Sequence, residues 1–239
     1  MVHEIEYRII GHDMQAVVVI LDKGETVRAE AGALMFMEEG VRMETTSGGL
    51  LKGLMRKISG ESFFITTYTC EAERAEVAFA APYPGSIIPV NLAETGPVLC
   101  QRDAYLCSAH GIDVSVAFTK RLGAGFFGGE GFVLQKLDAG EGLAFIHAGG
   151  TVYQRDLAPG QHIKVDTGCL VGFQASVDYD ITLAKGIKSM IFGGEGLFLA
   201  KLTGPGRVWL QTLPFSRLAN RVMTAAFSDK EEVKRLLNG

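Results

Sequence analysis

The chain has 239 residues, a formal net charge of −4 at pH 7 and 47% hydrophobic residues. This composition excludes a disordered chain, and the interspersed charges give no basic footprint for nucleic acid. No apolar run reaches the length of a membrane span, the N-terminus lacks the pattern of a signal peptide, and the four cysteines lack CxxC spacing. We therefore expect a soluble cytoplasmic protein with free thiols.

Strand patterns begin at the N-terminus. Residues 4–10 alternate in polarity, and residues 16–21 form an apolar, β-branched run typical of a strand covered on both faces. The stretch Leu157–Leu170 resembles Leu21–Leu34, with Leu, Gly, Gly and Leu at the same positions. Leu92–Leu106 is a looser third copy. Each copy predicts a turn, a strand, an acidic residue and a second strand.

A glycine–glutamate motif also recurs. Phe127–Leu137 and Phe192–Leu202 are identical at eight of eleven positions, and Ser59–Ile65 is a weaker third version. A period of about 65 residues is longer than that of ordinary solenoid repeats, so it favours three copies of a small β module. We predict one domain, residues 1–239, with pseudo-repeats at about 5–80, 86–147 and 152–211.

The C-terminal tail has a different pattern. Ser216–Met223 carries apolar residues at helical spacing, and Ser228 with Glu231 forms a capping-box pattern. We expect a helical tail over residues 216–238, formed by one helix or two and packed outside the β body.

The motif Gly193-Gly194-Glu195-Gly196, followed by the stretch Thr203–Gln211, resembles the altered-inheritance-of-mitochondria protein family, number twenty-four. The resemblance covers roughly residues 4–217. It implies an all-β fold similar to the tryptophan RNA-binding attenuation protein, described as a double-stranded β-helix and usually oligomeric. The mitochondrial members are linked to inner-membrane organisation and respiratory-complex integrity. The family supplies no catalytic residues or cofactor, and the acidic charge balance argues against RNA binding.

One glutamate recurs in each version of the motif: Glu61, Glu130 and Glu195. A threefold arrangement would place them on a ring, where three converging carboxylates need a cation, a proton or basic partners. The alternative, which we favour, is that each glutamate stabilises its own turn.

The segments before the motif mix bulky apolar and basic residues in all three copies. Such segments suit an anionic membrane surface or an apolar partner groove. The alternative, which we favour, is that the apolar side chains plug one end of the β body or form a subunit interface. The candidate docking rim consists of Leu54, Met55, Phe126, Phe127, Met190 and Ile191.

Motifs for metals, cofactors and nucleophiles are weak. The five histidines form no HxH or HxxxH pair, so we expect no bound metal. Gly123–Gly128 fits GxGxxG, but the βαβ context that nucleotide binding requires is missing. We expect no cofactor, and an enzyme is the less favoured class.

The sequence thus predicts an all-β, triplicated module with C-terminal helices that assembles as a homo-oligomer, most simply a trimer. Its leading function is that of a non-catalytic interaction or scaffold module, docking on a membrane surface or a protein partner. The alternative is a small-molecule-binding protein or enzyme with its site at a subunit interface. No nucleic-acid partner is expected.

Overall fold

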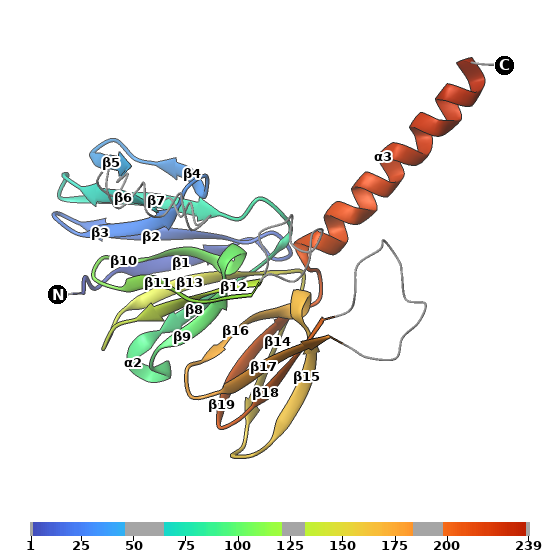
Figure 1. Cartoon of the computed structure of the whole chain (residues 1–239). Coiled ribbons are helices and arrows are strands. Elements are labelled where there is room, and N and C mark those ends of the chain that lie inside the picture. Colours follow the sequence, from blue (N-terminus) through green and yellow to red (C-terminus); the bar gives the residue numbers. More distant parts are fainter. Residues whose placement is uncertain (1, 46–64, 121–131, 184–197, 238–239) are drawn as a thin grey trace, which may run out of the picture.

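The computed structural model describes residues 2–45, 65–120, 132–183 and 198–237. In these ranges the chain forms four antiparallel sheets, and a long C-terminal helix extends from the β body (Figure 1). The all-β class predicted from the sequence is confirmed. The more specific double-stranded β-helix remains an expectation of the resemblance.

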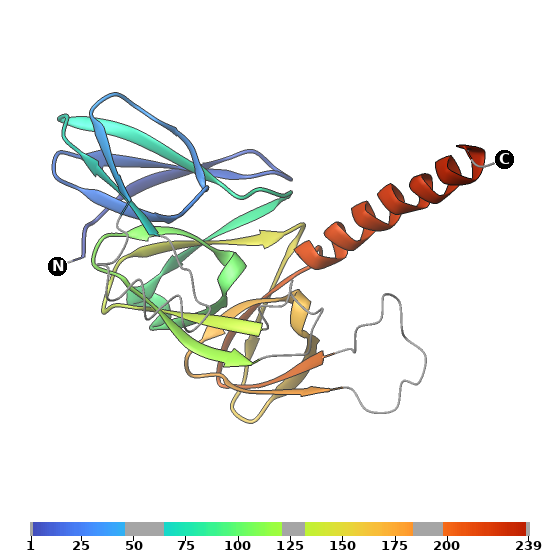
Figure 2. The same ribbon diagram turned by 45° about the horizontal axis from the view of Figure 1, so that its top comes forward.

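The two smaller sheets lie at opposite ends of the body, as Figures 1 and 2 both show. The first has the strand order β1-β2-β7-β4, and the last has the order β15-β18-β17. The bounds are β1 (Glu6–Ile10), β2 (Ala16–Asp22), β7 (Arg74–Ala80), β4 (Leu34–Met37), β15 (His162–Asp166), β18 (Phe198–Thr203) and β17 (Asp178–Leu183).

Two six-stranded sheets lie between them, and each takes three strands from one predicted repeat and three from the next. One has the order β5-β6-β3-β10-β13-β8: Val41–Thr45, Ile65–Cys70, Thr26–Glu30, Tyr105–Ala109, Leu143–Gly149 and Gly85–Asn91. The other has the order β11-β12-β9-β16-β19-β14: Asp113–Lys120, Phe132–Asp138, Val98–Gln101, Leu170–Gln174, Gly206–Gln211 and Val152–Leu157.

The local sequence explains these strands. In β2, Val17, Val18 and Val19 are all buried, so both faces of the strand are covered, as its continuous apolar run predicts. The turn glycines Gly24 and Gly160 both adopt positive φ angles, 84° and 75°, which other L-residues rarely adopt. The recurring glycine of the predicted repeat therefore serves the same kind of turn in the first and third copies.

The buried side chains form two clusters. The larger includes Phe79, Tyr105 and Phe145 and joins the first two predicted repeats. The smaller includes Phe132 and Phe173 and joins the second repeat to the third. Full burial of such a side chain stabilises the folded state by about 1.5–3 kcal/mol. Since both clusters cross the boundaries between predicted repeats, the contacts between repeats contribute to this stability.

A single helix, α3 (Phe215–Leu237), occupies the tail for which the sequence allowed one helix or two. Its first turns lie against the β body and its remainder projects outward (Figure 2). Among the described residues, no helix is both long enough and apolar enough to cross a bilayer.

Candidate functional site

The site residues predicted from the sequence lie outside the part of the chain that the structure describes. This applies to the repeated carboxylates and to the docking rim alike: Glu61, Glu130, Glu195, Leu54, Met55, Phe126, Phe127, Met190 and Ile191. The carboxylate ring and the rim therefore remain predictions. The described residues instead reveal a pocket at the base of α3, which the sequence did not predict.

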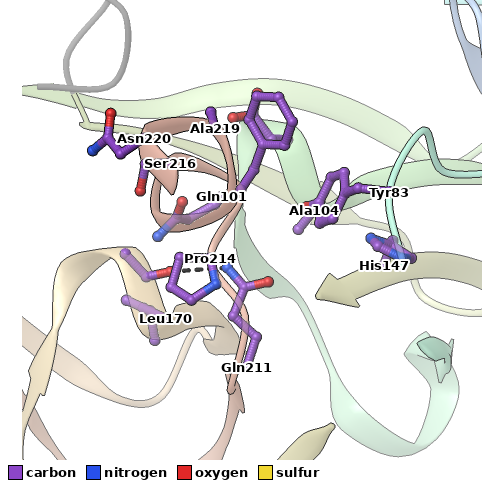
Figure 3. Close-up of a pocket in the computed structure, with 13 residues that line it drawn as sticks. Tyr83, Gln101, Ala104, His147, Leu170, Gln211, Pro214, Ser216, Ala219 and Asn220 are labelled. Atoms are coloured by element: carbon purple, nitrogen blue, oxygen red, sulfur yellow. Dashed lines mark hydrogen bonds between the residues drawn. The ribbon is translucent and has the colours of Figure 1, made fainter. Parts of the chain in front are cut away.

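The pocket has a volume of about 370 Å³ and opens where the second and third predicted repeats meet the first turns of α3 (Figure 3). A volume of this size accommodates a small organic molecule. It is lined by Tyr83, Gln101, Asp103, Ala104, His147, Gly168, Leu170, Gln211, Pro214, Phe215, Ser216, Ala219 and Asn220.

His147, on β13, is the most unusual group in this lining. It is 2% exposed, and its Nδ1 atom has no hydrogen-bond partner. Its ring packs edge-on against Tyr83, with ring centroids 4.7 Å apart, as the two adjacent side chains in Figure 3 illustrate. Burial lowers the pKa of His147 to about 4, so the imidazole is neutral at pH 7. The lining of the pocket thus includes a buried, neutral imidazole whose Nδ1 has no partner in the protein.

Two glutamine side chains hold the backbone around the pocket. The amide nitrogen of Gln101 donates to the carbonyl of Thr167 in the short helix η3 (Thr167–Cys169). Gln211 donates to the carbonyl of Gly168 at 2.8 Å and accepts from the N–H of Gly149 at 2.7 Å. Because these amides are already engaged with the backbone, they are suited to fixing the shape of the pocket.

The charged groups near the pocket are mainly acidic. The carboxylate oxygen Oδ1 of Asp103, in the short helix η1 (Arg102–Ala104), lies 3.6 Å from Nε of Arg102. Burial, with a further contribution from Asp103, raises the pKa of Glu30 to about 7. Burial and the same two carboxyl groups raise the pKa of Tyr83 to about 12. This field disfavours an anionic ligand.

The first turn of α3 is anchored at the rim of this pocket. Arg217 forms an ion pair with Asp166 of β15 at 2.8 Å. Phe215 contacts Tyr83, with ring centroids 5.2 Å apart, yet remains 50% exposed. Further along the helix, Val222 and Met223 are 59% and 51% exposed. An apolar stripe thus runs from the pocket onto the projecting helix.

Metal binding finds no support in the described ranges, which hold no group of three or more His, Cys, Asp or Glu side chains that could bind an ion. The described cysteines are free thiols. Burial raises the pKa values of Cys100 and Cys107, the former to about 12, so neither is an activated nucleophile.

Little in the sequence indicated the pocket. Tyr83 lies in a proline-punctuated turn and His147 in a closing strand, and neither belongs to a recognisable motif. The only available signal was the reappearance of polar residues, Gln101 and His147, at the ends of otherwise apolar strands. Such residues are more often satisfied structurally than used in function.

The chain is similar to a protein family, to a bacterial protein and to a solved structure. The family model described as "Mitochondrial biogenesis AIM24" matches residues 7–213. An uncharacterized protein of Streptococcus pyogenes serotype M6 is 26% identical over 207 residues, covering 83% of this chain and 82% of that protein. A crystal structure of a Streptococcus pyogenes protein superposes with a TM-score of 0.76 at 24% identity, covering 93% of this chain and all of that one. Since the family model spans most of the sequence, the chain belongs to the mitochondrial biogenesis AIM24 family.

Proposed function

We propose that this chain is a non-catalytic interaction module that docks on an anionic membrane surface through α3. The observation that carries the proposal is the exposure of Phe215, Val222 and Met223 on a helix that projects from the β body. Exposed apolar side chains at spacings of seven and eight residues lie on one face of an α-helix.

The charge of the described part of the helix supports this choice of surface. Residues 215–237 contain five basic and three acidic residues, which gives the helix a net charge of +2. Basic residues flanking an apolar stripe are typical of helices that lie in the membrane interface, where anionic headgroups attract the cations and the acyl boundary receives the apolar face. A helix of 23 residues is about 34 Å long, so it could lie along such a surface while the β body remains in water.

Vesicle flotation tests this proposal. We expect the protein to float with phosphatidylcholine vesicles that contain phosphatidylglycerol at low salt, and to float less with pure phosphatidylcholine. Val222→Asp with Met223→Asp should abolish flotation, because two charges then lie on the apolar stripe. The matched control is Met14→Asp, which changes a methionine of the β body that is 69% exposed.

Two results would contradict the docking role of α3: no flotation of the wild type at low salt, or equal flotation of the double variant and the control. The rim predicted from the sequence can be compared in the same assay. Loss of flotation in Leu54→Asp or Phe126→Asp, with the α3 variant unaffected, would assign docking to that rim instead.

The alternative function is binding of a small uncharged molecule in the pocket at the base of α3, and the volume of the pocket and the Tyr83–His147 ring pair in its lining favour it. A ligand of this kind should raise the melting temperature of the wild type and leave that of His147→Phe unchanged. If it stabilises both proteins equally, it binds elsewhere.

A further inference from the structure

Residues 2–5, which precede β1, lie at the junction between the first two predicted repeats, and we call them the N-terminal latch. The N–H of His3 donates to the carbonyl of His110 at 3.1 Å, and Nδ1 of His3 accepts from the N–H of Thr26 at 2.9 Å. The N–H of His110 in turn donates to the carbonyl of Thr26 at 3.0 Å. His3 therefore binds the first repeat through its ring and the second through its backbone.

Two apolar side chains hold the latch against the larger core cluster. Ile5 is 5% exposed, and Val2 is partly buried against the same cluster. Cγ1 of Val2 lies 2.5 Å from the point at which a side chain at Gly142 would place its Cβ, so a larger residue there would displace Val2. The docked position of the latch thus depends on apolar packing as well as on the hydrogen bonds of His3.

The equivalent junction between the second and third predicted repeats needs no such acceptor. Strand β9 pairs with β16 there as β3 pairs with β10, and the N–H of Ala175 donates to the carbonyl of Pro97 at 2.8 Å. Pro97 thus occupies the position that Thr26 has at the first junction, and proline has no N–H to satisfy. The first junction has one additional donor, and His3 supplies its acceptor.

The hydrogen bond from Thr26 fixes the protonation state of the docked His3. A ring nitrogen that accepts a hydrogen bond carries no proton, so the imidazole is neutral and its proton lies on Nε2. Protonation of both ring nitrogens would set one N–H against another and leave the Thr26 donor without its acceptor. A charged His3 is therefore incompatible with the docked latch.

A second histidine and an arginine add to this effect. The ring centroids of His3 and His110 lie 5.0 Å apart. Arg28 crosses the junction, and its guanidinium donates to the carbonyl of Ile112 at 3.3 Å. Burial lowers the pKa of His110, and the positive charges of His3, Arg28 and the amino terminus lower it further. Acidification therefore places like charges next to each other at this junction.

The carboxyl groups of the surrounding segments offset these charges only weakly. Glu4, Asp113 and Glu141 are exposed, and water and salt screen exposed charges. The carboxylate of Glu25, the residue before Thr26, accepts from the N–H of Asp22 at 2.8 Å.

We propose that the N-terminal latch is an acid-sensitive switch, in which protonation of His3 and His110 releases residues 2–5 from the junction between the first two predicted repeats. Release ends at β1, because β1 is paired with β2 from Glu6 onward. It exposes the side chains of Val2 and Ile5 and leaves the core cluster beneath them open to solvent. The switch is independent of membrane docking, since no residue of α3 takes part in it.

Amide hydrogen exchange followed by NMR measures the release, because the N–H of Thr26 is protected while His3 accepts from it. A free imidazole titrates near pH 6.5, so a docked state that excludes one proton should lose protection at Thr26 by up to about tenfold between pH 7.5 and 5.5. The protection factor corrects for the intrinsic pH dependence of exchange. The N–H of Val18, in the centre of β2 between β1 and β7, is the reference and should change less.

Three variants identify the group that responds to pH. In His3→Asn the side-chain carbonyl still accepts from Thr26 but does not titrate, so protection should stay high at both pH values. His3→Leu removes the acceptor and should lower protection at both. The matched control is His12→Asn, which makes the same change at an exposed histidine and should respond as the wild type does.

Three results would overturn the proposal. In the first, the wild type keeps its protection at Thr26 down to pH 5.5. In the second, the wild type and His3→Asn lose protection equally, which would assign the pH response to another group. In the third, Val18 loses protection in parallel with Thr26, which would indicate unfolding of the β body as a whole.

Discussion

Glu30 provides the sharpest test of the electrostatics near the pocket. Its carboxyl group is partly buried in β3, and its pKa is raised from 4.5 to about 7, chiefly by burial and then by Asp103. In the unfolded chain the group ionises near its ordinary pKa, so the folded state retains a proton that the unfolded state releases. Stability therefore falls as pH rises from about 4.5 through 7 and levels off above it.

Glu30→Gln removes the titrating carboxyl group and with it the loss of stability at high pH. The magnitude has an upper limit of about 3 kcal/mol at pH 8, because one pKa unit corresponds to about 1.36 kcal/mol. The structure also supplies a precedent, since Gln101 ends β9 as Glu30 ends the similarly paired β3, and the Gln101 amide donates to the backbone of the following repeat. We expect the variant to match the wild type at pH 4.5 and to be more stable at pH 8.

Urea unfolding from pH 4.5 to 8 measures the difference between the two proteins. The control is Glu39→Gln, because Glu39 is exposed and its substitution makes the same chemical change on the surface. A constant difference between Glu30→Gln and the wild type across the whole range would refute the assigned cause, as would a destabilised variant at pH 8.

Three further outcomes follow from the structure. His147 has a pKa lowered to about 4, so the unfolded chain takes up its proton first and stability falls as pH drops below 6.5; His147→Phe should reduce that acid sensitivity in urea unfolding. Gly149→Ala should cost about 2 kcal/mol or more in the same assay, because the added Cβ would lie 2.0 Å from the carbonyl oxygen of Leu213. Glu76→Gln breaks an exposed pair with Arg8 and should change the melting temperature little, with the change shrinking further at high salt.

The strands of this protein could be predicted because each is determined by a few neighbouring residues. A continuous apolar run predicted β2, and the spacing of leucine and glycine indicated that Leu21–Leu34 and Leu157–Leu170 are similar stretches. The capping-box and apolar patterns of the tail gave α3, although not its continuity as one helix. Periodicity of this kind reports which face of an element is buried, and it does so without knowledge of the partner.

The candidate carboxylates and the docking rim fall on segments outside the described residues, so they stand as predictions. The pocket was beyond the reach of the sequence for a physical reason. Tyr83, His147 and Phe215 come from a turn, a strand and a helix, and only the packing of separate repeats brings them into contact. Nothing in the residues adjacent to His147 indicates that its Nδ1 would lose its partner.

The sequence by itself determined the all-β class, the family, the helical tail and the pattern of three similar segments, because local periodicity and turn chemistry carry that information. The tertiary structure decided how neighbouring segments join. Among the described strands, β10 and β16 are each covered by a strand of the preceding segment, whereas β4 pairs only with β7. That distinction depends on which strands from distant parts of the chain lie side by side, and the pattern of neighbouring residues does not carry this information.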